Sequence, residues 1–132
     1  HNYIDFRDHI IRKGAISARY EEKVLIPLNM RDGSVIGIGK CNPDWNYSAP
    51  HGAGRKMSRH QARQNIKLED FKKEMEGIDT FSVDESTIDE APDAYKDSRT
   101  IIKSIEPTIV VFDIIKPLYN FKAKEKKREA ME

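Results

Sequence analysis

The sequence has 132 residues, which is enough for one modest hydrophobic core. Its single cysteine excludes a disulfide framework and favours a reducing, cytoplasmic compartment, and no apolar run approaches the length that crosses a bilayer, so we expect no membrane partner. The formal net charge of +1 conceals a separation of charge, because residues 55–67 contain cations and no acid whereas residues 79–97 are rich in Asp and Glu. This separation favours a local site for a polyanion, although a solvated charged face would show the same pattern.

Three short strands are predicted in the first third of the chain. Residues 10–16 favour a strand or hairpin edge with a turn at Gly14, and residues 24–26 favour a second strand that ends at Pro27. Apolar residues alternate through residues 35–39, which predicts the third strand.

Two loops follow these strands closely. The Asn, Asp and Gly content of residues 29–34 predicts a loop, so Ser34 lies where a loop meets a strand. That position is common for a ligand contact and also for a residue that merely closes a turn. A second loop, residues 41–47, carries Trp45 and Tyr47, whose rings could stack on a base or anchor the loop on the core; we favour the anchoring role.

The stretch most informative about chemistry is residues 47–59, in which His51 is followed by Gly52 and Gly54 and then by a run of cations. Glycine permits a sharp turn and a close approach of backbone N–H groups to a ligand, which suits a phosphate. His51 could attack a phosphorus atom through a neutral ring nitrogen, or it could donate a hydrogen bond to a phosphate oxygen. A glycine turn that only leads into a helix is the simpler alternative.

A helix is predicted to begin at Ser58, which with Gln61 has the spacing of a capping box. Apolar residues then recur at helical spacing at Leu68, Phe71, Met75 and Ile78. The four-residue spacing of Arg55, Arg59 and Arg63 places their guanidinium groups on a shared face, where they could bind RNA phosphates in pairs of hydrogen bonds.

The second half of the chain predicts one more helix and two strands. Residues 80–83 favour a strand, and an acidic first turn with an early proline at residues 89–92 predicts the start of a helix that ends at Pro107. Residues 108–112 are continuously apolar, which predicts a central strand buried on both faces.

Together these elements predict an α+β fold, a mixed β-sheet of about five short strands packed by two main helices. Residues 123–132 form a highly charged tail with few apolar residues, which we expect to be solvated or frayed.

Several short motifs also occur along the chain in a fixed order. They are His1-Asn2-Tyr3, Arg12-Lys13-Gly14-Ala15, Ile26-Pro27-Leu28-Asn29-Met30, the stretch from His51 to Arg59, Asp89-Glu90-Ala91-Pro92 with Ala94-Tyr95-Lys96, and Lys122. The ordered set resembles the C-terminal part of RtcB-type RNA ligases, the enzymes of tRNA splicing and RNA repair. The resemblance covers residues 1–122 as part of one ligase domain and leaves the charged tail outside it.

This resemblance implies a GTP-dependent RNA ligase that uses Mn²⁺. A histidine nitrogen, which the motif places at His51, attacks the α-phosphate of GTP to form a histidine–GMP intermediate. The GMP then passes to an RNA 3′-phosphate, which can arise from a 2′,3′-cyclic phosphate, and a 5′-hydroxyl displaces it. The expected RNA partners are tRNA halves or broken RNA.

The resemblance also implies roles for other positions. His1 matches a metal-binding histidine, and Lys122 matches a lysine that contacts the base. The expected nucleotide contacts are Asn2, Pro27, Leu28, Asn29, Met30, Ser34, Gly52, Ala53, Gly54, Tyr95 and Lys122.

Three features depart from the family pattern. Leu28 and Asn29 replace a small Gly-Ser pair, and Cys41 stands where glycine is usual. The remaining metal ligands of the family lie upstream of His1, so we expect the upstream part of the ligase as a partner and this chain to be inactive alone. A non-catalytic nucleotide- or RNA-binding module, and a structural fragment that completes another chain, are the alternatives.

Overall fold

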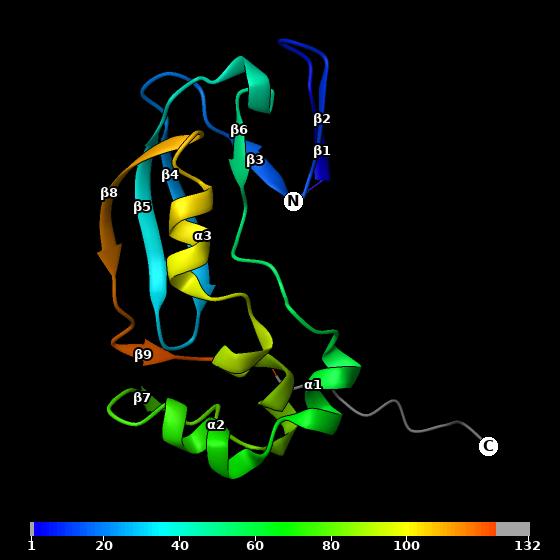
Figure 1. Ribbon diagram of the computed structural model, residues 1–132, viewed down its shortest axis with the longest axis vertical. Helices are drawn as coiled ribbons and strands as arrows, with labels where there is room; N and C mark the ends of the chain where they lie inside the picture. Colours follow the sequence, from blue (N-terminus) through cyan, green and yellow to red (C-terminus); the bar gives the residue numbers. More distant parts are fainter. Residues whose placement is uncertain (1, 124–132) are drawn as a thin grey trace, which may run out of the picture.

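The computed structural model describes residues 2–123 (Figure 1). The strands are β1 (Asn2–Asp5), β2 (Ile10–Lys13), β3 (Ala15–Ser17), β4 (Lys23–Asn29), β5 (Gly33–Gly39), β6 (Ser48–Pro50), β7 (Asp79–Thr80), β8 (Ile109–Ile115) and β9 (Tyr119–Asn120). The helices are α1 (Arg59–Asn65), α2 (Leu68–Glu74), α3 (Ser98–Ser104) and the 3₁₀ helices η1 (Pro43–Trp45), η2 (Glu85–Glu90) and η3 (Pro92–Ala94). The α+β class is therefore confirmed.

The described strands divide among four small sheets instead of joining in one. The largest is antiparallel and has the order β4-β5-β8. Strand β1 pairs with β2 and β3 pairs with β6, both antiparallel, whereas β7 and β9 are parallel. Because residues 10–13 and 15–17 pair with different partners, the turn at Gly14 separates two sheets.

Two hydrophobic cores hold these elements together. The first lies between the three-stranded sheet and α3, which crosses one face of β4 and β5 in Figure 1. Its buried residues are Ala18, Val24, Ile26, Leu28, Val35, Ala49, Ala53, Ile105 and Ile109. The second core joins α1 and α2 to η2 and η3, and its buried residues are Met30, Ala62, Ile66, Phe71, Met75, Ile88, Ala91 and Ala94. Residues between the start of β4 and Ala62 contribute to both cores. The segment that contains His51 therefore runs from the first core, at Ala49 and Ala53, to the second, at Ala62.

Several local predictions are confirmed. The Oγ atom of Ser58 accepts a hydrogen bond from the Gln61 N–H at 3.1 Å, and the Gln61 side chain accepts one from the Ser58 N–H at 3.0 Å, so the predicted capping box begins α1. The strand predicted at residues 35–39 is β5. The helical region is interrupted after Asn65, because Ile66 and Lys67 are extended before α2 begins.

The prediction that a strand ends at Pro27 is wrong, because β4 continues to Asn29. Proline has no N–H to donate to a ladder and is tolerated at a sheet edge. Among the described strands, β4 is such an edge, and its register with β5 shifts between Pro27 and Asn29.

The second main helix begins later than the sequence predicts. Residues 85–90 and 92–94 form 3₁₀ turns, Tyr95 is extended, and α3 starts only at Ser98. Asp97 caps it by accepting a hydrogen bond from the Thr100 N–H at 3.0 Å. The acidic turn with an early proline therefore marks the start of short 3₁₀ turns and not of the helix itself.

Two strand predictions also differ from the structure. Of the strand expected at residues 80–83, Thr80 alone lies in a strand, as the second residue of β7. Strand β8, expected in the centre of a sheet, lies at an edge of the described sheet with Val110 54% and Phe112 75% exposed. His1 and residues 124–132, which include most of the predicted tail, lie outside the described residues. Among the residues described, no helix is both long and apolar enough to cross a membrane.

Candidate functional site

The backbone of His51 is fixed by two neighbouring strands. Strand β6 ends at Pro50, which pairs with Ala15 of β3, so His51 follows directly from a short ladder. The His51 N–H donates a hydrogen bond to the Gly14 carbonyl at 3.3 Å. The Arg12-Lys13-Gly14-Ala15 motif therefore lies beside the His51 motif, although more than thirty residues separate the two motifs in the sequence.

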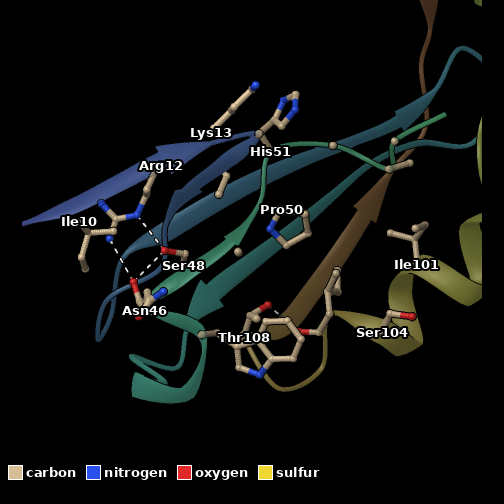
Figure 2. Close-up of a pocket in the computed structure, with 18 of the residues that line it drawn as sticks. Ile10, Arg12, Lys13, Asn46, Ser48, Pro50, His51, Ile101, Ser104 and Thr108 are labelled. Atoms are coloured by element: carbon tan, nitrogen blue, oxygen red, sulfur yellow. Dashed lines mark hydrogen bonds between the residues drawn. The ribbon is translucent and has the colours of Figure 1, made fainter. Parts of the chain in front are cut away.

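The His51 ring lies beside Gly14 at one end of a cavity of about 560 Å³. Gly14 has φ of +67°, in the left-handed region that glycine adopts without strain, and a Cβ at that position would lie 3.6 Å from the ring atoms Cδ2 and Nε2. Figure 2 shows His51 and Lys13 side by side, with Ser104 and Thr108 at the far side of the cavity. The ring is half-buried, so a ligand in the cavity could reach it.

The glycine loop after His51 is held from both sides. The Ala53 N–H donates to the Pro27 carbonyl of β4 at 3.0 Å, and the Gly54 carbonyl accepts from the Lys96 N–H at 3.1 Å. Arg55 then forms an isolated antiparallel bridge with Tyr95. The loop is therefore a fixed bridge between the β4 edge and the segment that carries Tyr95, which preorganises the backbone that a phosphate would approach.

A buried arginine supports the strand that leads to His51. Arg12 is only 1% exposed, and its Nε atom donates to Ser48 Oγ of β6 at 2.8 Å. Its Nη2 atom donates to the carbonyls of Asn46 and Tyr47, both at 3.4 Å. Its Nη1 atom donates to Asp5 Oδ2 at 2.6 Å. Sequence reasoning quoted Arg12 only as part of a motif, and the local pattern does not mark it as inward, because the apolar neighbour Ile11 is the exposed one.

We call Arg12, Asp5, Arg19 and Asp8 the Arg12 cluster. Arg19 contacts Asp5 at 2.9 Å and Asp8 at 2.5 Å. Hydrogen bonds from Arg12 and then from Arg19 hold the pKa of the Asp5 carboxyl well below its usual range. Asp5 therefore stays ionised through the neutral range, and the cluster joins the β1–β2 hairpin to the chain just before β6.

The three arginines predicted to bind phosphate do come together, but on two carboxylates. Arg59 contacts Asp89 Oδ2 and Glu90 Oε1, both at 2.6 Å. Arg55 contacts Glu90 at 3.1 Å, and Arg63 contacts Asp89 at 3.6 Å. The acidic stretch that seemed separate from the basic stretch in the sequence thus lies against it, so the expected surplus of positive charge is largely compensated.

Tyr95 and Lys122, both expected near the nucleotide, converge on the same Glu90. The Tyr95 hydroxyl donates to Glu90 Oε2 at 2.7 Å, and Lys122 Nζ lies 3.4 Å from that atom. We call the two carboxylates Glu90 and Asp89, together with the side chains that contact either of them, the Glu90 cluster; these side chains are Arg55, Arg59, Arg63, Tyr95 and Lys122. Burial, and then the hydrogen bond to Glu90, raise the pKa of Tyr95 to about 12. Burial opposes ionisation of Glu90, but hydrogen bonds from Tyr95 and Arg59 outweigh it and lower the pKa of Glu90.

The other expected nucleotide contacts are spread along β4, β5 and β1. Leu28 and Met30 point into the first and second cores respectively, whereas Pro27 is exposed opposite Ser34. Asn29 donates to Asp32 at 2.9 Å, an aspartate that also accepts from Ser98.

Asn2 is exposed on β1 and pairs with Lys13. Among the expected nucleotide contacts in residues 2–123, Gly52, Ala53 and Gly54 line the cavity beside His51. Tyr95 and Lys122 belong to the Glu90 cluster, and the others lie on β1 or along β4 and β5 and the turn between them, so the expected contacts are not gathered in one place.

The loop before His51 carries two aromatic residues that were both expected to anchor it, and the structure agrees for Tyr47 and differs for Trp45. Tyr47 packs beneath the Arg19 guanidinium, 5.2 Å from its ring centre, which agrees with an anchoring role. Trp45 is instead half-exposed and lines the cavity, so the anchoring role favoured for it is wrong and its ring is accessible to a ligand. Cys41 has φ of +54°, which explains physically why glycine suits that position.

The described residues do not fit a manganese site. Within residues 2–123 no group of three His, Cys, Asp or Glu side chains is close enough to hold a metal ion. The one metal ligand expected from the sequence, His1, lies outside that range.

A fixed histidine at the rim of a cavity, followed by a glycine loop and by clustered arginines, brings together groups whose chemistry suits phosphate. Comparison with known sequences identifies the family. The model of the family described as "tRNA-splicing ligase RtcB" matches residues 1–123, and the chain belongs to this family.

Three relatives illustrate the match. The RNA-splicing ligase RtcB of Escherichia coli K12 is 36% identical over 108 residues, which are 77% of this chain and 26% of the relative. The tRNA-splicing ligase RtcB of Aeropyrum pernix is 40% identical over 81 residues, 58% of this chain and 17% of the relative. That of Methanopyrus kandleri is 34% identical over 108 residues, 76% of this chain and 11% of the relative. The chain thus spans about a quarter or less of the length of these curated relatives.

Proposed function

We propose that this chain supplies the nucleophilic histidine and part of the nucleotide- and RNA-binding surface of a GTP-dependent RNA ligase. The observation that carries the proposal is the placement of His51 at the rim of the 560 Å³ cavity, directly before a loop fixed by the hydrogen bonds of Ala53 and Gly54. Membership of the RtcB family supports the reaction class.

In the proposed reaction, a ring nitrogen of His51 attacks the α-phosphorus of GTP. A nitrogen–phosphorus bond forms, the bond to the bridging oxygen breaks, and pyrophosphate leaves. The guanylate then passes to an RNA 3′-phosphate, and a 5′-hydroxyl displaces it as the strand is sealed. For this chemistry the chain contributes a fixed imidazole, and the neighbouring backbone of Gly52 to Gly54 offers N–H groups to phosphate oxygens.

The tRNA or broken RNA would lie along the cations near the loop. Arg59 is the most exposed arginine of the Glu90 cluster, with 52% of its side chain accessible, so it could exchange a carboxylate oxygen for a phosphate oxygen. Lys13 lies beside His51 and was not singled out from the sequence; a single positive charge there would suit a reacting phosphate.

Manganese, which the resemblance implies, would supply charge neutralisation at the phosphates. Because the described residues hold no group of metal ligands, we propose that the rest of the RtcB fold provides it. The single cysteine of the sequence suits a reducing compartment, so we place the activity in the cytoplasm.

The decisive experiment measures guanylate attachment by intact-mass analysis. The chain is joined to the rest of the RtcB fold and incubated with GTP and Mn²⁺, and we expect a mass gain of one guanylate per chain. His51→Ala should abolish the gain. His60→Ala is the matched control, because His60 is an exposed histidine of α1, and it should retain the gain.

Two outcomes would contradict the proposal. If the His51→Ala variant acquires guanylate at the same yield, then His51 is not the nucleophile. If the unaltered protein binds GTP or RNA but never acquires the covalent mass, the chain belongs to a non-catalytic binding module, the alternative that the lack of a metal group in residues 2–123 favours.

A further inference from the structure

The sequence of β8 is typical of a central strand, whereas its position is at an edge of the described sheet. This difference indicates that a further strand pairs with β8. Strand β8 reads Ile-Val-Val-Phe-Asp-Ile-Ile, in which every residue except Asp113 is apolar, a composition that is typical of a strand covered on both faces and paired on both edges. In the structure it pairs with β5 on one edge, and no described strand pairs with the other.

The other edge of the same sheet shows what a true edge looks like. Strand β4 contains Pro27, which has no N–H to donate, and a register shift follows it. The Pro27 carbonyl is already bonded to the Ala53 N–H. Proline and irregularity are the devices by which proteins protect edges from further pairing. Strand β8 has no proline and no lysine, and its features of this kind are the single charge of Asp113 and the bulge beside it.

The outer face of the sheet, opposite α3, is also largely apolar. The registers place Leu25 beside Ile36, and Ile38 beside Val110, on that face, with the charged residues Asp113 and Lys23 at the ends of these two rows. The row of Pro27, Ser34 and Ile115 continues it. Leu25 and Val110 are each 54% exposed, and Phe112 is 75% exposed, and exposed apolar side chains gathered on one face commonly mark an interaction site.

We propose that β8 is a central strand in the assembled ligase, and that a part of the RtcB fold which this chain does not span adds a β-strand to its free edge and covers the outer face. The length of the relatives argues for this occupant, since the chain spans 26% of the Escherichia coli ligase. The position of the face argues for it too, because its last row contains Pro27 and Ser34, two expected nucleotide contacts, so the same docking would complete the site. The inference does not depend on the chemistry of His51.

The test uses the Escherichia coli relative without its own matching stretch as the probe. The chain is mixed with this probe, and the complex is followed by size-exclusion chromatography with light scattering and by hydrogen exchange. We expect a one-to-one complex in which amides of residues 109–115 exchange at least tenfold more slowly than in the chain alone, while those of residues 23–29 change little. A chimera, in which the chain replaces the matching stretch of the intact relative, provides the same exchange measurement if the probe does not fold.

Phe112→Lys and Phe6→Lys form a matched pair of variants. Phe6 is 79% exposed on the turn between β1 and β2, and Phe112 is 75% exposed on β8, so neither substitution removes buried packing from the chain. Phe112→Lys should weaken the complex at least tenfold, and Phe6→Lys should not.

Three results would overturn the proposal. The first is unchanged exchange of residues 109–115 in the complex or the chimera. The second is an equal affinity of Phe112→Lys and the unaltered chain for the probe. The third is a dimer of the chain alone that protects β8 and is lost in Phe112→Lys, which would make a second copy the occupant. Guanylate attachment at His51 can succeed or fail independently of each.

Discussion

The Arg12 cluster contacts residues that precede His51 in the sequence, and the Glu90 cluster contains arginines that follow it. The central group of the first cluster is a cation, and that of the second is an anion. In the Arg12 cluster a buried guanidinium is the centre, and its nitrogens donate to Ser48, to Asp5 and to backbone carbonyls. In the Glu90 cluster a carboxylate is the centre, and more exposed cations surround it. The central guanidinium of the first cluster is therefore buried among fixed partners, whereas the second has cations that solvent or a ligand can reach.

This difference gives the Arg12 cluster a structural role and lets the exposed cations of the Glu90 cluster bind a ligand. A fully bonded, buried arginine is too costly to expose, so the Arg12 cluster can only hold the strand before His51 in place. The Glu90 cluster holds Arg55 and Tyr95 after the loop, but its exposed members can trade a carboxylate partner for a phosphate. The predictions below test this division, beginning with the largest effect.

The largest loss of stability is expected for Arg12→Met. The substitution keeps the length of the side chain but removes the guanidinium, so Ser48 Oγ loses its donor and Asp5 loses one of its two arginine partners. We expect the free energy of unfolding to fall by about 3 kcal/mol or more, measured by urea denaturation. Lys72→Met on the exposed face of α2 is the control and should change it by less than about 0.5 kcal/mol. Equal losses in the two variants would show that the Arg12 cluster has no special role.

A smaller loss is expected for Glu90→Gln, because the amide keeps the shape and one acceptor but not the charge. We expect about 2 kcal/mol in the same denaturation experiment. The substitution should also lower the pKa of Tyr95 from about 12, since the hydrogen bond and the charge of Glu90 are among the causes of its rise.

Phenolate absorbance reports this pKa, with Tyr95→Phe as the subtraction control that identifies the signal. A Tyr95 titration that stays at about 12 in Glu90→Gln would mean that burial alone sets it.

The two clusters should also lose stability at different pH. A carboxyl whose pKa is lowered in the folded state contributes stability above its unfolded pKa and loses it as pH falls through the folded value. The ordinary values are 4.5 for Glu90 and 3.8 for Asp5, and the pKa of Asp5 is lowered well below the usual range.

The stability gap between the unaltered chain and Glu90→Gln should therefore narrow as pH falls below about 4.5, while the gap for Asp5→Asn persists to lower pH. Urea denaturation in a series of acidic buffers measures both. At low pH the stability difference between the unaltered chain and Glu90→Gln should become smaller than at neutral pH but should not fall to zero, because a protonated Glu90 can still form hydrogen bonds. Stability differences that stay constant with pH in both variants would contradict the lowered pKa values of Glu90 and Asp5.

The sequence predicted local features whose cause is local. The capping box of Ser58 and the strand at β5 depend on residues a few positions apart, and both are present. The α+β class follows from the same alternation of patterns. The start of α3 was misplaced because Pro92 and the acids before it suit a 3₁₀ turn as well as an α-helix, and only packing decides between them.

Long-range pairing was beyond the sequence for a physical reason. The acids Asp89 and Glu90 lie about thirty residues from Arg59, and nothing local indicates that the two charge runs meet, so the arginines were predicted as uncompensated. The inward position of Arg12 was missed for the same reason, because its partners Ser48 and Tyr47 come from a distant strand. By contrast, the apolar run of β8 describes an environment that residues 2–123 do not supply.

The smallest expected effect on stability is that of Arg63→Ala, and it distinguishes binding from support most directly. Arg63 lies 3.6 Å from Asp89 with 41% of its side chain exposed, so the ion pair should contribute less than about 0.5 kcal/mol to the free energy of unfolding. If the exposed cations of the Glu90 cluster bind RNA phosphates, however, the assembled ligase with Arg63→Ala should bind RNA more weakly, and the slope of log affinity against log salt should decrease by about 0.7 to 1. Fluorescence anisotropy with a labelled RNA at several salt concentrations measures the slope. Arg99→Ala, at an exposed arginine of α3, is the matched control and should leave the slope unchanged. Equal slopes for the Arg63→Ala and unaltered proteins would place the RNA away from Arg63.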